Sequence, residues 1–158
     1  MRSDDLLSVA DDLVSTRSRK PRQSNLRRAV SSAYYAMFHC LARCCADTLV
    51  GSRSADRSRP AWRQVYRALE HGLAKKNCKN QTIIKKFPQD IEDFANTFVS
   101  LQEKRHAADY DPFAQFTKQE VRSDIAATRN AIERFQSVPI RDRREFAAFV
   151  LFRSRPRQ

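Results

Sequence analysis

The residues best suited to chemistry stand together in the segment 105–110. A guanidinium, an imidazole, a carboxylate and a phenol occur within this short span: Arg105, His106, Asp109 and Tyr110. Such groups can hold a phosphodiester, stabilise the negative charge that develops on it and move a proton. The same residues allow a purely structural interpretation, in which Arg105 and Asp109 form an ion pair on one face of a helix. Both interpretations are open at this point.

A second set of polar side chains lies on the segment Leu26–His39, whose other residues are typical of a buried helix. At about 100° per residue, every third or fourth position falls on the same side of a helix. One side of this segment and of its continuation is polar, and the opposite side is apolar. The polar stripe consists of Arg28, Ser32, Tyr35, His39 and Arg43. A helix with this pattern faces a packed core on one side and a polar site or surface on the other.

The elements that position these side chains are predicted to be helices. Only two glycines occur, strand-type alternation is hard to find, and apolar residues recur at three- and four-residue spacing along most of the chain. We therefore expect an all-α fold, an up-and-down bundle of about five helices with a short additional helix at the C-terminal end. The first predicted helix starts after Ser3. The others span about 24–48, 61–73, 88–109, 117–139 and 145–152.

Local signals set several of these boundaries. Ser3 is expected to cap the first helix, and the segment 117–120 matches a capping box. The segment 74–86 is predicted to be a loop or a short helical turn. A chain of 158 residues is expected to form one domain, in which residues 1–140 make the bundle and residues 141–158 add a short amphipathic helix and a basic tail.

The formal net charge is +12, and arginine supplies most of it. A field of this strength attracts phosphate backbones at long range and weakens as the salt concentration rises. The charge therefore favours RNA or another acidic partner, and a solvated basic surface is the alternative. Basic residues concentrate in the segments 17–22, 53–59 and 141–144.

Several other kinds of site are not indicated. The sequence contains no glycine-rich phosphate loop, no HExxH metal pair and no EF-hand series. The four cysteines, three of them within positions 40–45, lack the spacing of a zinc ribbon and are expected to be reduced core thiols. We therefore expect neither a metal nor a cofactor. No apolar segment approaches the roughly 20 residues that span a bilayer, so we expect a soluble cytoplasmic protein that does not bind membranes.

Two segments carry a family resemblance. The run Arg28–His39, followed about seventy residues later by Arg105–Pro112, resembles the HEPN domain, particularly its small stand-alone prokaryotic members. Over roughly residues 3–138, this resemblance implies a bundle of about five helices that commonly dimerises, with both protomers lining a basic cleft. HEPN proteins are associated with RNA cleavage without metal, with toxin-antitoxin pairs in which a nucleotidyltransferase is the partner, and with defence against phage.

The resemblance also implies roles for particular residues. Nuclease members resemble one another in an arginine followed by four to six residues and then a histidine, and Arg105 matches that arginine. The positions allowed for the histidine hold Tyr110, Asp111 and Pro112 instead. The candidate catalytic residues are therefore Arg105, His106 and Tyr110. The candidate residues of an RNA-binding cleft are Arg28, Ser32, Tyr35, His39 and Asp109.

Three functions follow as hypotheses. The leading one is a homodimeric RNA- or nucleotide-binding component of a toxin-antitoxin or phage-defence system. The first alternative is a metal-independent endoribonuclease toxin, in which Arg105 clamps the phosphate and one of His106, Tyr110 and His39 moves a proton. The second alternative is a non-catalytic interaction module that pairs with an acidic partner protein such as a nucleotidyltransferase. Whether the protein is an enzyme is left open, because the motif histidine is missing and ordinary packing also explains His39.

Overall fold

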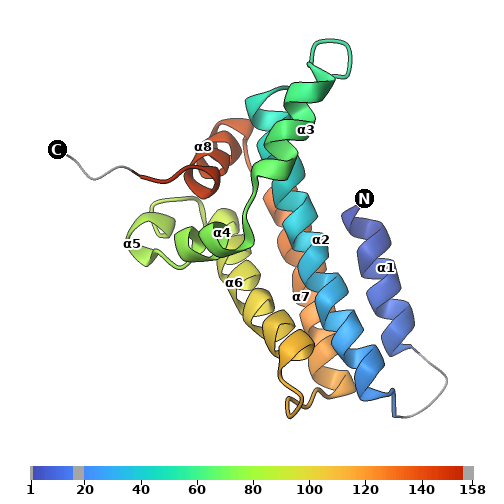
Figure 1. Ribbon diagram of the computed structural model, residues 1–158. Helices are drawn as coiled ribbons and strands as arrows, with labels where there is room; N and C mark the ends of the chain where they lie inside the picture. Colours follow the sequence, from blue (N-terminus) through green and yellow to red (C-terminus); the bar gives the residue numbers. More distant parts are fainter. Residues whose placement is uncertain (1, 16–19, 155–158) are drawn as a thin grey trace.

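The computed structural model describes residues 2–15 and 20–154, and within these ranges it contains eight helices and no strands (Figure 1). The all-α class expected from the sequence is confirmed. The helices are α1 (Ser3–Val14), α2 (Gln23–Leu49), α3 (Arg59–Ala68), α4 (His71–Cys78), α5 (Gln81–Ile84), α6 (Gln89–Tyr110), α7 (Lys118–Gln136) and α8 (Ile140–Leu151). Within the described ranges, none of them combines the length and the apolar character that crossing a bilayer requires.

The long helix α2 is the centre of the fold. It packs against α1, α3, α6, α7 and α8, and in Figure 1 it runs between α1 and α6 with α7 behind it. Because neighbours cover it on several sides, its buried surface is wider than the single stripe of a peripheral helix. Short buried side chains let those neighbours approach closely. They are Ala29, Ala33, Ala36, Ala42 and Ala46.

Large side chains from several helices fill the core around α2. Tyr34 of α2 is completely buried, and Phe94, Phe135 and Phe146 bring α6, α7 and α8 together. The rings of Phe94 and Phe135 stack with their centroids 4.2 Å apart. All four cysteines are unpaired and buried, as expected. The core therefore includes α8, which packs on α2 and whose Phe146, Ala147 and Val150 are buried.

The prediction of one helix over residues 61–73 is wrong. Helix α3 ends at Ala68, the backbone is extended at Leu69 and Glu70, and α4 starts at His71. Leu69 continues the apolar period of α3 and is buried, so the sequence pattern does not reveal that its backbone has left the helix. The break turns the chain so that α4 packs on α6 and α8. Most of α4 and all of α5 lie in the segment that was predicted to be a loop or a short turn.

The starts of three helices can be compared with the signals in the sequence, and two of them differ from the prediction. Ser3 is the first residue of α1 and not its cap, and its Oγ donates a hydrogen bond to the Ala36 carbonyl of α2 at 2.8 Å. The capping box of α7 is confirmed, with both of its hydrogen bonds present between Thr117 and Glu120. Helix α8 starts directly after Pro139, earlier than predicted. The predicted basic segments extend into residues 16–19 and 155–158, which lie outside the described residues.

Candidate functional site

Arg105 extends from α6 towards α2, and its guanidinium is held on several sides. One Nη donates a hydrogen bond to the Tyr35 hydroxyl at 3.0 Å. Nε lies 3.2 Å from Asp109 Oδ2, but its N–H is not directed at an acceptor, so this contact is an ion pair without a hydrogen bond. The guanidinium carbon also lies 5.3 Å from the ring centroid of Tyr34 and 5.4 Å from that of Tyr35. The ion pair of the structural interpretation is therefore formed.

Asp109 connects this ion pair to α2. Its Oδ1 accepts a hydrogen bond from the Ser31 hydroxyl at 2.8 Å. The candidate residues included Ser32 and omitted Ser31. Because Ser31 follows Arg28 by three residues and precedes Tyr35 by four, helical spacing alone was sufficient to place it on the same face.

A groove runs over this face of α2, and all five candidate cleft residues line it. Its volume is about 510 Å³, and Leu6 of α1 and Ser31 of α2 complete the lining. The side chain of Arg28 is exposed there and makes no ion pair or hydrogen bond within residues 2–15 and 20–154. The groove thus combines a cation that is available to a ligand with hydroxyl groups and an imidazole. Its candidate residues are Arg28, Ser32, Tyr35, His39 and Asp109.

His39 closes one end of the groove and is fixed by α3. Its Nδ1 lies 2.5 Å from the hydroxyl of Tyr66, and the two rings stack with their centroids 5.9 Å apart. Burial lowers the pKa of His39 below its ordinary value of 6.5, so the imidazole is neutral at pH 7. A neutral imidazole has one donor nitrogen and one acceptor nitrogen, and the contact with Tyr66 leaves Nε2 uncommitted.

His71, at the start of α4, supports the site from behind and was not among the candidates. Its Nδ1 lies 2.6 Å from the hydroxyl of the buried Tyr34, and its ring stacks on Phe38 with a centroid distance of 4.0 Å. Burial lowers the pKa of His71, and the positive charge of Arg105 lowers it further. Neutral His71 can therefore accept the hydrogen bond of the phenol, whose own pKa burial raises. No sequence signal connects His71 to Tyr34, because the break after α3 creates their contact.

The three candidate catalytic residues are not brought together. Arg105 faces α2, whereas His106 and Tyr110 are both exposed, and neither lines the groove. Their rings contact each other at a centroid distance of 4.9 Å. Adjacent residues of a helix point about 100° apart, which separates His106 from Arg105.

A clamp that the sequence did not suggest holds the chain just after Asp109. The guanidinium of Arg27 donates hydrogen bonds to four carbonyl groups at the end of α6 and in the following loop, with distances between 2.5 and 3.4 Å. Gln23 adds hydrogen bonds in both directions with the backbone of Phe116. Carbonyls at a helix C-terminus lack partners within the helix, so a cation is well suited to this place. The first two turns of α2 thereby fix the end of α6 that carries Asp109.

Comparisons with known proteins found no relative of this chain. No family model matches it, and neither curated proteins nor solved structures gave a significant match. The resemblance to the HEPN domain therefore depends on the two sequence segments alone.

Proposed function

We propose that the protein binds RNA through the groove on α2, as the RNA-binding component that the HEPN resemblance predicts. The observation that carries this proposal is the uncommitted guanidinium of Arg28 in a groove whose other polar groups are hydroxyls, a neutral imidazole and the paired carboxylate of Asp109. Guanidinium groups and hydroxyls are the usual partners of phosphate oxygens and of the ribose 2′-hydroxyl. The net charge of +12 would draw an RNA strand towards the protein from a distance.

The two segments that resemble HEPN sequences meet at this groove. Tyr35 from the first segment accepts a hydrogen bond from Arg105 of the second, and Ser31 donates one to Asp109. The carboxylate of Asp109 would repel phosphate if it were unpaired. Because Arg105 and Ser31 both contact it, the negative charge in the groove is largely offset, which supports RNA binding there.

Binding is favoured over cleavage by the state of the candidate catalytic residues. Arg105 is only 14% exposed and is engaged by Asp109 and Tyr35, so it has little freedom to follow a changing phosphate. His106 and Tyr110 lie outside the groove and cannot reach a phosphate that Arg28 holds in it without a different arrangement. RNA binding in the groove requires no rearrangement of Arg105, His106 or Tyr110.

Fluorescence anisotropy with a short single-stranded RNA tests the proposal. We expect binding at low salt, a loss of affinity as salt is added, and about five- to tenfold weaker binding for Arg28→Ala. The slope of log affinity against log salt should fall by about 0.7 in this variant, as expected when one phosphate contact is lost. Arg122→Ala is the matched control, because it removes the same charge from an exposed site on α7. Equal effects of the two substitutions would contradict a role for the groove.

One observation favours a second candidate function, a metal-independent endoribonuclease. His39 lies in the groove, is neutral at pH 7 and has Nε2 uncommitted, which are the properties of a general base. It would take the proton of a ribose 2′-hydroxyl as that oxygen bonds to the adjacent phosphorus and the 5′-oxygen leaves with a proton from water.

Cleavage of RNA in the presence of EDTA tests this candidate. We expect His39→Gln to abolish the cleavage and His106→Gln to leave it unchanged. If His39→Gln cleaved as fast as the unaltered protein, His39 would be excluded as the base. A complete lack of cleavage by the unaltered protein would reject the endoribonuclease and would leave the binding function in place.

A further inference from the structure

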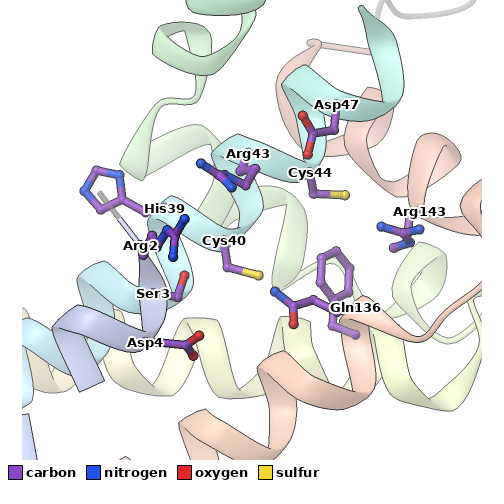
Figure 2. Close-up of a pocket in the computed structure, with 11 residues that line it drawn as sticks. Arg2, Ser3, Asp4, His39, Cys40, Arg43, Cys44, Asp47, Gln136 and Arg143 are labelled. Atoms are coloured by element: carbon purple, nitrogen blue, oxygen red, sulfur yellow. The ribbon is translucent and has the colours of Figure 1, made fainter. Parts of the chain in front are cut away.

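A second cavity adjoins the groove at His39, which lines both of them. It has a volume of about 290 Å³ and lies among the start of α1, the C-terminal half of α2, the end of α7 and the first turn of α8 (Figure 2). The groove and this cavity are therefore neighbours along α2, with His39 between them. Arg28 lies in the groove and Arg43 in the cavity.

Three arginines from three helical regions line the cavity: Arg2, Arg43 and Arg143. Arg2 and Arg43 make no ion pair or side-chain hydrogen bond with any residue in the described ranges. Nε of Arg143 donates to the Val138 carbonyl at 2.8 Å, which fixes the side chain beside the Cys44 thiol at the edge of the cavity. In Figure 2, Arg2 and Arg43 lie on one side of the cavity and Arg143 on the other.

Two carboxylates also line the cavity and offset part of this charge. Asp47 accepts a hydrogen bond from the Trp62 indole at 2.8 Å and lies 3.5 Å from an Arg57 nitrogen, so its charge is already engaged outside the cavity. Asp4 is exposed at the start of α1. The positive charge around the cavity therefore exceeds the negative charge.

The floor of the cavity is uncharged. Cys40 and Cys44 are each 6% exposed, and Figure 2 shows their sulfur atoms directed towards Gln136 and Arg143. Burial raises the pKa of Cys40 to about 12 and that of Cys44 to about 11, although the positive charge of Arg143 opposes the rise at both. Both thiols are therefore neutral at pH 7 and do not repel an anion.

We propose that this cavity binds a phosphomonoester, namely the phosphate at one end of an RNA strand whose neighbouring nucleotides lie in the α2 groove. The proposal depends on the RNA-binding function proposed above. A terminal phosphate carries between one and two negative charges at pH 7, whereas an internal phosphodiester carries one, and three guanidinium groups suit the higher charge. A free phosphorylated small molecule has the same chemistry, and the experiment below distinguishes the two sources.

Three versions of one RNA test the proposal: a strand with a 5′-phosphate, a strand with a 3′-phosphate and a strand with hydroxyl groups at both ends. We expect one phosphorylated strand to bind about tenfold more tightly than the unphosphorylated strand, and Arg43→Ala to remove this difference. Arg122→Ala, which removes the same charge on α7, should keep it. Equal binding of all three strands by the unaltered protein would overturn the assignment of an RNA end to the cavity.

A second measurement does not depend on RNA binding. A small neutral thiosulfonate reagent should modify Cys40 and Cys44 several-fold more slowly when inorganic phosphate replaces chloride at equal ionic strength. Arg43→Ala should abolish this protection, and the fully buried Cys45 and Cys78 serve as internal references. Protection by phosphate without any preference among the RNA strands would assign the cavity to a free phosphorylated molecule and would overturn the RNA-end proposal. No protection would overturn the cavity as a phosphate site, even if the groove binds RNA.

Discussion

Arg105 is the residue in which the structural and the functional interpretations of the site meet. It forms the ion pair with Asp109 that the spacing predicted, and the same side chain supports Tyr35 in the wall of the groove. The tyrosine hydroxyl accepts this hydrogen bond, which fixes the position of Tyr35 in the wall of the groove. A structural role for Arg105 and a binding role for the α2 stripe are therefore compatible.

Removing the carboxylate partner of Arg105 should destabilise the protein. In Asp109→Ala the guanidinium, which is mostly buried, keeps its positive charge without a neutralising group, and we expect a loss of about 1 to 2 kcal/mol in the free energy of unfolding. Asp90→Ala is the control, because its contact with Arg134 joins two exposed side chains and should contribute less than about 0.5 kcal/mol. Urea unfolding measures both values. Equal losses of stability in the two variants would show that Asp109 does not stabilise the buried charge of Arg105.

The neutral histidines make stability depend on pH. Burial lowers the pKa of His39 and of His71 in the folded protein below the ordinary value of 6.5, so the unfolded chain binds more protons as the solution becomes acidic. Stability should therefore be full well above the unfolded pKa of about 6.5 and fall as the pH decreases below it, until the folded imidazoles are protonated as well. Urea unfolding at several pH values tests this, and His71→Gln should show a shallower dependence. A stability that rises on acidification over this range would contradict the assignment of neutral imidazoles.

At the scale of residues, the sequence was sufficient for the stripe and insufficient for its supports. Helical spacing identified Arg28, Ser32, Tyr35 and His39, because all of them lie on one helix. His71 contacts this helix only after the chain has turned at Leu69 and Glu70, and Tyr66 contacts it because α3 packs back on α2. Contacts of that kind depend on tertiary packing, which periodicity does not encode.

At the scale of elements, the N-terminal turns of α2 and the C-terminal end of α6 act as one unit. Arg27 joins them through hydrogen bonds to four carbonyls, and Gln23 fixes Phe116 beyond the loop. This arrangement sets the position of Asp109 relative to Ser31. The sequence pattern placed Arg27 on a helix but gave no indication of the carbonyls that it would meet.

Loss of this clamp should loosen the loop without unfolding the helices. Arg27→Met keeps an unbranched side chain and a good helix former but removes every donor, so we expect a loss of about 2 kcal/mol in stability. Amide hydrogen exchange should become faster in residues 111–117 and stay unchanged in α3. Uniformly faster exchange along the whole chain would indicate a global loss of stability and would contradict a local clamp.

The bounds of the helices illustrate what hydrophobic periodicity can and cannot predict. Helices α2, α6 and α7 each have a continuous apolar face, and their predicted bounds were close to the observed ones. The break between α3 and α4 was missed because Leu69 is buried with extended backbone, so that an apolar side chain occurs where a continuous helix would also have one. The start of α8 was placed too late because Ile140 is exposed, so the apolar pattern begins only further along the helix. Pro139, which directly precedes the helix, was the better indication of where it starts.

At the scale of the whole molecule, two neighbouring hollows along the central helix α2 hold arginines that form no ion pair within the described part of the chain. Arg28 lies in the groove and Arg43 in the cavity, and His39 lines both. Arginines also occur in the segments 53–59 and 141–144, so charge alone does not decide where RNA binds. The homodimer and the nucleotidyltransferase partner stay predictions of the HEPN resemblance, and light scattering of the purified protein checks the first of them.

The central claim is that RNA lies in the groove on α2, and amide chemical shifts of the isotopically labelled protein test it most directly. On titration with a short single-stranded RNA, we predict the largest shift changes at residues 28–39 and at Asp109, with smaller ones in α4. Changes confined to residues 53–59, with none along α2, would contradict the account.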